Sequence, residues 1–281
     1  MMTYEHIRID RGEFIDWLVL NRPDRANAMS NAMLDEFSAA LELLKGDGAP
    51  VIGIRGEGKG FCSGFDLDQV GKMGAAAVDP VADKARLQRN LDRWLAIWDH
   101  PKPVIAAVHG YCLAGATQMC VFADITVVAD DARIGEPTIP IGGGYLAPVW
   151  STLVGPKRAK ELAFVPGNSI DGPTAVAWGW ANHCVPAVDL IASVEGLAAR
   201  IALTPPDVLR IKKHSINRAA EAQGFRAAAA HVADMDALLH QSPAVHAVKQ
   251  RGGEIGLKAL IAEYRSAPTT PLKPYSRDSG N

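Results

Sequence analysis

The chain has 281 residues, of which 48% are apolar and 21% charged, and its formal net charge is −2. This length and composition fit one large α/β domain with or without a short appendage. Lys and Arg are not concentrated in one stretch, which argues against a nucleic-acid partner. The four cysteines form no CxxC pair and no metal-ligand spacing, so they are typical of reduced packing residues in a cytoplasmic protein.

Neither a signal peptide nor a membrane segment is indicated. The first residues lack the basic region and the apolar core of a signal peptide. Residues 103–123 carry no Asp, Glu, Lys or Arg, but Pro103, His109 and Gly110 interrupt them. A buried strand followed by a helix fits this stretch better than a membrane span, so we expect no membrane partner.

The first predicted elements are two strands and a helix. Residues 4–10 and 14–20 have strand patterns, joined by a turn at 11–13. A loop over residues 21–29 follows, and Ser30 then starts a helix that runs to about Leu44 with apolar residues at helical spacing. Residues 50–54 form a third predicted strand.

Two later stretches share one pattern, a strand followed by a glycine turn and a helix start. The first is residues 58–68, after the strand at 50–54, with Asp66 as an acid at the helix start. The second has the strand 104–108, then Gly110, then the small residues 113–116 that open a helix to about Ala123. The first amides of a helix lack partners within it and favour an oxyanion, although small residues at such a corner can also serve packing alone.

The remaining elements are mostly helices. Residues 70–83 are rich in Gly and Ala and are expected to shape a ligand pocket. The tail from Ser266 to Asn281 is rich in Pro, Ser and Thr, and we expect it to be disordered. A strand is predicted at 124–129, and helices at 85–98, 148–163, 172–180, 194–202, 206–219, 227–239, 243–249 and 257–264.

Taken together, the two turns resemble the crotonase (enoyl-CoA hydratase/isomerase) superfamily over about residues 4–264. That family has the patterns "F-C-[AS]-G-x-D-L" and "G-Y-A-L-G-G-G-x-E-L", matched here by Phe61 to Leu67 and by residues 110–119. Each supplies one amide of an oxyanion hole, and the resemblance places these amides on Phe65 and Gly115. It also implies an α/β spiral of repeated ββα units with a C-terminal helical region that holds a homotrimer or a dimer of trimers.

The resemblance further implies where an acyl-coenzyme A substrate lies. The family loop "N-R-P-x-x-x-N-A-[LM]" lies against coenzyme A and is matched by residues 21–29. Within it, Arg25 is a candidate for the coenzyme's phosphates, although it can equally be a solvated loop cation. No cofactor besides the coenzyme of the substrate is implied. The expected coenzyme-binding residues are Arg25, Ala26, Ala28, Ser63, Phe65, Asp66 and Leu67.

The sequence departs from the family at its acid–base residues. Hydratases of this family use two glutamates, and the alignment puts Gln118 and Thr138 at these positions. Neither side chain can exchange a proton near neutral pH. Each general acid or base contributes about 10²- to 10⁴-fold, so ordinary hydration by two glutamates is doubtful.

Glu136 and Tyr145 are candidate replacements. Glu136 lies two residues before Thr138 and shares a face with it in an extended segment, unless it pairs with Arg133. Tyr145 lies in a glycine-rich loop and is either a hydrogen-bond donor to the substrate or an aromatic of the pocket wall. His109 ends a buried strand and is better interpreted as a structural histidine.

The prediction is therefore an acyl-CoA enzyme with two oxyanion amides and lyase, isomerase or hydrolase chemistry. The alternatives are a hydratase with a relocated acid and base, and a non-catalytic acyl-CoA-binding or scaffold protein. We expect a spiral core over residues 1–200, a C-terminal helical region over 201–265 and a tail over 266–281.

Overall fold

The structure, a computed structural model, describes residues 4–67, 79–136, 138–142 and 147–265. Tyr145, most of the Gly/Ala-rich stretch at 70–83 and the tail from residue 266 lie outside the described residues. Within the described residues, no helix combines the length and the apolar character that a membrane crossing requires.

The core is built on a six-stranded sheet. Its order is β1-β2-β3-β4-β6-β9, and all neighbours run parallel except the antiparallel pair β1 and β2. The central strands are almost completely buried, as expected for a parallel sheet with both faces covered. The strands are β1 (Ile7–Asp10), β2 (Ile15–Leu20), β3 (Val51–Gly56), β4 (Val104–Val108), β6 (Ile125–Ala129) and β9 (His183–Val185).

A second, three-stranded sheet carries the predicted turns. It consists of β5 (Tyr111–Leu113), β7 (Arg133–Gly135) and β8 (Ser169–Ile170), in the order β5-β7-β8. The sequence pattern predicted a direct passage from Gly110 into a helix and did not include β5. Three residues are too few to show strand alternation, and β5 exists because its neighbours supply its hydrogen bonds.

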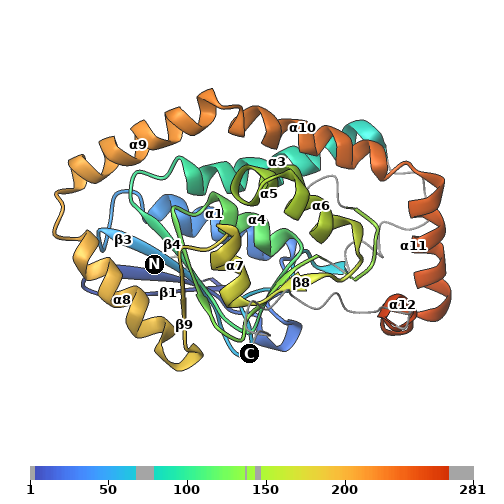
Figure 1. Cartoon of the computed structure of the whole chain (residues 1–281), viewed down its shortest axis with the longest axis horizontal. Coiled ribbons are helices and arrows are strands. Elements are labelled where there is room, and N and C mark those ends of the chain that lie inside the picture. The colour runs from blue at the N-terminus through green and yellow to red at the C-terminus, as the bar shows by residue number, and fades with distance from the viewer. Residues whose placement is uncertain (1–3, 68–78, 137, 143–146, 266–281) are drawn as a thin grey trace, which may run out of the picture.

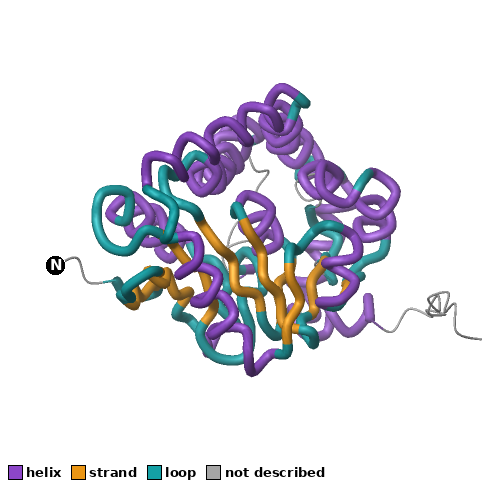
Figure 2. Tube along the Cα trace, turned by 60° about the vertical axis from the view of Figure 1, so that its left-hand side comes forward, coloured by secondary structure: helices purple, strands orange, loops and turns teal. Residues whose placement is uncertain are grey.

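Helices cover the large sheet on both sides (Figures 1 and 2). On one side lie α1 (Asn31–Leu43), α3 (Pro80–Trp98) and α4 (Gly115–Phe122), and α4 is buried along its whole length. The predicted start of α1 is confirmed, because the Ser30 side chain accepts a hydrogen bond from the Met33 amide at 3.2 Å. The other face is covered by α8 (Leu190–Ile201).

The single helix predicted at 148–163 is wrong, because the structure has two. They are α5 (Ala147–Val154) and α6 (Pro156–Phe164). Between them, Gly155 has a φ of 78° and Pro156 occupies the first turn of α6. A proline has no amide to continue α5 but suits a helix start, so the chain breaks at this pair.

The C-terminal helices form an arch over the core (Figure 1). In this arch α10 lies along α3, and the Trp98 and Phe225 rings stack at 4.3 Å between centroids. Two short 3-10 helices lie at 23–25 and 187–189. The remaining helices are α7 (Gly172–Trp178), α9 (Pro206–Ala222), α10 (Phe225–Leu239), α11 (Pro243–Ile255) and α12 (Leu257–Arg265).

Candidate active site

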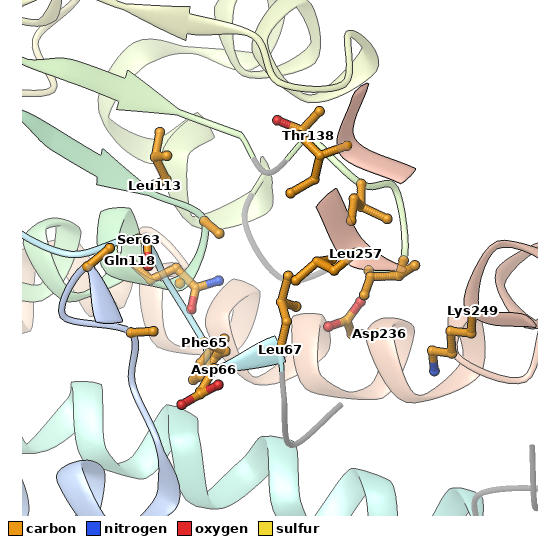
Figure 3. A pocket seen from close by; sticks show the side chains of 18 of the residues that line it. Ser63, Phe65, Asp66, Leu67, Leu113, Gln118, Thr138, Asp236, Lys249 and Leu257 are labelled. Atoms are coloured by element: carbon orange, nitrogen blue, oxygen red, sulfur yellow. The ribbon is translucent and has the colours of Figure 1, made fainter. Parts of the chain in front are cut away.

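A cavity of about 550 Å³ lies between the second sheet and the arch of C-terminal helices. Figure 3 shows side chains from both sides pointing into it. On the sheet side the lining comes from the loop at 24–28, the turn at 63–67 and the start of α4. On the opposite side it comes from α3, the segment 138–142 and the helices α10 to α12.

The two predicted amide-bearing turns end neighbouring extended segments. An isolated parallel bridge pairs Cys62 with Cys112, the middle residue of β5. The Cys62 amide donates to the Tyr111 carbonyl at 3.1 Å, and the Leu113 amide donates to the Cys62 carbonyl at 3.0 Å. The two segments run in the same direction from this bridge. Residue 65 and residue 115 each follow it by three positions, so the register leads both to the same edge of the cavity. Adjacent strands lie about 4.8 Å apart, so we expect the two predicted amides to lie close together.

The contact between the two turns requires glycine. A Cβ on Gly115 would lie 2.4 Å from the Phe65 ring carbon Cε2. A Cβ on Gly64, whose φ is 98°, would lie 2.8 Å from the Ala114 Cβ and 2.9 Å from the Leu113 carbonyl oxygen. Carbon atoms in normal contact are about 3.5 to 4 Å apart, so larger residues would push the turns apart.

Ala114 has a backbone conformation that L-residues rarely adopt. Its φ is 51° and its ψ is −128°, directly before the first residue of α4. Such a conformation costs about 1–3 kcal/mol and persists only where the surroundings enforce it. Here the Ala114 amide donates to the Gly135 carbonyl at 2.8 Å, and the Ala114 carbonyl accepts from the Thr117 hydroxyl at 2.8 Å. The second sheet therefore fixes the direction in which α4 begins.

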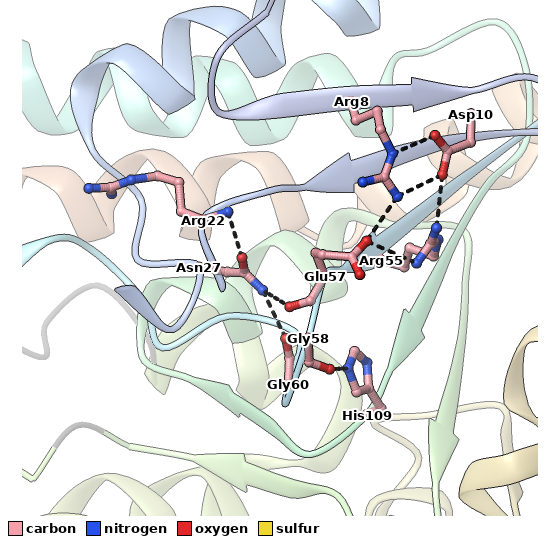
Figure 4. Close-up of polar contacts among 9 residues, drawn as sticks. All are labelled: Arg8, Asp10, Arg22, Asn27, Arg55, Glu57, Gly58, Gly60 and His109. Carbon is pink, nitrogen blue, oxygen red and sulfur yellow. Dashed lines mark hydrogen bonds and ion pairs between the residues drawn. The ribbon is translucent and has the colours of Figure 1, made fainter. Parts of the chain in front are cut away.

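The loop of residues 21–29 is held against the first turn by a buried asparagine (Figure 4). The Asn27 side chain accepts from the Arg22 amide and donates to the carbonyls of Glu57 and Gly60 at 2.8 and 3.0 Å. The same figure shows the His109 ring nitrogen Nε2 at 3.0 Å from the Gly58 carbonyl. His109 is thus a structural histidine, as the sequence predicted.

A partly buried ion pair also joins the loop to the first turn. Arg22 bonds to the Asp66 carboxylate at 3.0 Å, and it donates to the Ala28 carbonyl. The Met29 amide donates to the Gly64 carbonyl, and the Asp66 amide donates to the Met29 carbonyl. These bonds align the loop with the turn, so both line one side of the cavity.

All the residues predicted to bind coenzyme A line this cavity. Arg25 is exposed at its rim in the 3-10 helix at 23–25, where its guanidinium can meet solvent and ligand. Ala26, Ala28 and Ser63 have small side chains. The larger side chains of Phe65, Asp66 and Leu67 lie together in Figure 3. Their common placement makes this side of the cavity the candidate coenzyme surface.

Gln118 and Thr138, at the positions of the family's glutamates, both line the cavity. Gln118 is fully buried on α4, and its Oε1 atom accepts from the Trp94 indole nitrogen at 3.2 Å. This bond fixes the amide orientation. Thr138 lies across the cavity from Gln118 in Figure 3. The structure therefore brings the two positions to one cavity but supplies neither with an acid.

Glu136 is buried, with 6% of its surface exposed. Burial and then the charge of Asp236 raise the pKa of Glu136 to about 8. Its carboxyl group is therefore mostly protonated at neutral pH. The pairing with Arg133 is not formed, because Arg133 instead donates to the Ser169 hydroxyl and the Gly167 carbonyl. Unlike Thr138, Glu136 does not line the cavity, although Asp236 beside it does.

The cysteines near the site are packing residues. Cys62, Cys112 and Cys120 are buried free thiols, and Cys184 is a partly buried one. Burial raises the pKa of the Cys62 thiol to about 12, and its sulfur lies 3.0 Å from the Asn27 carbonyl oxygen. A protonated, enclosed thiol is a poor nucleophile, so the thiol of Cys62 contributes packing to the first turn.

Sequence reasoning missed a set of charged residues on the far wall of the cavity. These are Asp83 and Arg86 from α3, Asp236 and His240 at the end of α10, and Lys249 from α11. These residues span more than 150 positions of the sequence, so no local motif reveals that they lie close together. The spacing of four between Asp236 and His240, which puts both on one helix face, was the available signal.

Comparisons with known proteins agree with this geometry. The model of the family described as enoyl-CoA hydratase/isomerase matches residues 12–253. The chain is 32% identical to the Delta(3,5)-Delta(2,4)-dienoyl-CoA isomerase of Dictyostelium discoideum, covering 77% of this chain and 78% of that protein. It is 29% identical to the hydroxycinnamoyl-CoA hydratase-lyase of Pseudomonas fluorescens, covering 79% of this chain and 83% of that protein.

A solved structure shows the same fold. It belongs to a Novosphingobium aromaticivorans protein named for the enoyl-CoA hydratase/isomerase group, with 52% identity and a TM-score of 0.89. The similarity covers 92% of this chain and 95% of that one. The family match, the relatives and the shared spiral fold together show that this chain belongs to the enoyl-CoA hydratase/isomerase family, within the crotonase superfamily.

Proposed function

We propose that the protein binds an acyl-CoA thioester and stabilises negative charge on the thioester oxygen with the amides of Phe65 and Gly115. The observation that carries this proposal is the parallel register from Cys62 and Cys112, which leads both residues to one edge of the cavity. Donors that follow two adjacent extended segments can each reach one shared oxygen at hydrogen-bond distance. Such preorganised donors act where charge develops during the reaction.

The proposed chemistry is isomerisation, hydrolysis or another lyase reaction rather than hydration by two glutamates. An enolate or a tetrahedral oxyanion needs the two amides, whereas adding water by the family's usual route needs two proton-exchanging groups. Gln118 and Thr138 occupy those positions here, and neither can fill that role. The isomerase and hydratase-lyase relatives are consistent with this range of chemistry.

A second candidate function is hydration with a relocated acid. It is favoured by Glu136, because a carboxyl group whose pKa is about 8 is available as a proton donor at neutral pH. This candidate requires Glu136, or Asp236 beside it, to reach the substrate. Its signature is hydration that depends on Glu136.

The test compares binding with hydration. Calorimetric titration with butyryl-CoA measures binding, and the loss of crotonyl-CoA absorbance measures hydration in the wild type and in Glu136→Gln. We expect the wild type to bind butyryl-CoA and to hydrate crotonyl-CoA far below the range of about 1–10³ s⁻¹ typical of enzymes.

Binding of butyryl-CoA with slow hydration supports the proposal, and each other outcome has a different consequence. Rapid hydration that persists in Glu136→Gln contradicts the proposal. Rapid hydration that falls by orders of magnitude in Glu136→Gln supports the relocated acid. If no acyl-CoA binds, the protein is a scaffold and both candidates fail.

A further inference from the structure

Three ionisable side chains from two helices form a chain of contacts on the far wall of the cavity. The His240 ring nitrogen Nδ1 lies 2.6 Å from Oδ2 of Asp83, and its Nε2 lies 3.9 Å from Oδ2 of Asp236. Arg86 also holds Asp83, at 2.6 Å. The side chains of Asp83 and Asp236 are 1% and 7% exposed, so these carboxylates lie almost entirely out of bulk solvent.

Asp83 fixes the orientation of the imidazole. A carboxylate can only accept, so His240 donates through Nδ1, and Nε2 becomes the nitrogen that can meet a ligand. Nε2 faces Gly142, where an added Cβ would lie 3.5 Å from it and 3.5 Å from Oδ1 of Asp236. Because Gly142 has no side chain, it leaves both polar atoms accessible from the cavity that all three residues line.

This polar wall lies across the cavity from the amide-bearing turns. Figure 3 shows Ser63, Gln118 and Phe65 on one side, and Asp236 and Lys249 on the other. The turns and the polar wall line one cavity, so in the proposed function the acyl group has this space available. A plain alkyl chain packed against Nε2 of His240 would remove water from this nitrogen without offering it a hydrogen bond, which is unfavourable.

We propose that the natural acyl group carries a hydroxyl group and that Nε2 of His240 accepts a hydrogen bond from it, with Asp83 as the positioning residue. The inference rests on the proposed acyl-CoA function and specifies its substrate class as a hydroxyacyl-CoA. A neutral oxygen fits better than a carboxylate, because Asp83 and Asp236 oppose Arg86 and Lys249 and leave little net charge on the wall.

Calorimetry with four CoA thioesters tests the proposal. Butyryl-CoA is the alkyl reference, 3-hydroxybutyryl-CoA and 4-hydroxybutyryl-CoA place a hydroxyl at two depths, and succinyl-CoA replaces it with a carboxylate. We expect one hydroxyacyl-CoA to bind the wild type about tenfold or more tightly than butyryl-CoA, because it satisfies a buried polar group. In His240→Leu this preference falls to within about twofold while butyryl-CoA still binds.

Two further variants separate ligand recognition from damage to the fold. Gly142→Ala adds a methyl group at ordinary contact distance from Nε2, so the fold tolerates it but the hydroxyl preference falls. His231→Leu, at an exposed position of α10, keeps the preference. Circular dichroism and thermal unfolding of each variant confirm that it is folded.

The proposal is overturned if butyryl-CoA binds the wild type as tightly as both hydroxyacyl-CoA probes. It is also overturned if succinyl-CoA binds tightest, or if the preference survives in both His240→Leu and Gly142→Ala. Failure of every thioester to bind instead removes the proposed acyl-CoA function, so the two failures are distinguishable.

Discussion

Gly115→Ala probes the contact between the two amide-bearing turns. The new Cβ would lie 2.4 Å from Cε2 and 2.7 Å from Cδ2 of the Phe65 ring. Normal contact between carbon atoms needs about 3.5 Å, so the ring must move by about 1 Å. Because the ring and the Phe65 amide belong to one residue, this displacement misaligns the proposed donor relative to Gly115.

The expected loss is larger for oxyanion stabilisation than for folding. Removing one donor from an oxyanion hole costs about 10²- to 10³-fold, or about 2.7–4 kcal/mol. Overpacking costs about 1–3 kcal/mol of folding free energy, partly offset because alanine favours a helix over glycine by about 1 kcal/mol. The variant should therefore fold and still bind the coenzyme.

The assay measures the acidity of bound acetoacetyl-CoA, whose enolate absorbs ultraviolet light. Each unit of pKa is about 1.4 kcal/mol, so complete loss of one donor raises the pKa of the bound ligand by about 2–3 units. Gly196→Ala on α8 is the matched control, because its Cβ meets nothing within 4 Å. An enolate that titrates at the same pH in Gly115→Ala and in the control would refute the shared oxyanion site.

Two further predictions concern buried charges. In Glu136→Gln, stability relative to the wild type should rise as pH increases from about 5 to 8 and then level off. The folded state keeps the Glu136 pKa near 8 instead of 4.5, so ionisation in this window favours the unfolded wild type by about 1.4 kcal/mol per pH unit. Urea denaturation across this range checks it, and a difference independent of pH would contradict the burial of Glu136. Lys213→Met should cost about 3–5 kcal/mol at neutral pH, because it strips Asp124 of the ammonium 2.7 Å away. Denaturation curves measure this loss of unfolding free energy, and a loss below about 1 kcal/mol would disprove the role of the ion pair. The double variant Lys213→Met with Asp124→Leu should recover much of the stability, because it leaves no unpaired charge.

The sheet-side half of the candidate site was predictable from the sequence because it is local. Each turn is a continuous segment in which strand, glycine and small residues follow in order, and the loop before Ser30 is equally continuous. Ser30 as a helix cap also depends on a near neighbour, the Met33 amide three positions later. Local chemistry determines these elements, so local patterns reveal them.

The helical half was not predictable because its residues meet only through tertiary packing. Asp83 and His240 are 157 positions apart, and their contact depends on α10 lying along α3. The break at Gly155 has a different cause, because the Gly155-Pro156 pair is itself a local signal, which the prediction of one helix over 148–163 overlooked. Periodicity reports which faces are buried but not which distant faces meet.

The division of the cavity into these halves has a consequence for chemistry. In the proposed function the turns bind the thioester oxygen through backbone amides, so this part of the site depends on the glycines that let the turns meet and not on an ionisable side chain. Proton transfer needs side chains, and the two positions aligned with the family's glutamates hold Gln118 and Thr138, on opposite sides of the cavity. A contacting set of ionisable groups instead comes from α3 and the end of α10, where His240 lies against Asp83 and near Asp236. Substitutions on those helices can therefore change which acyl group the cavity accepts, or which reaction follows, without changing the turns. Similarity in the turns thus identifies the family but not the substrate.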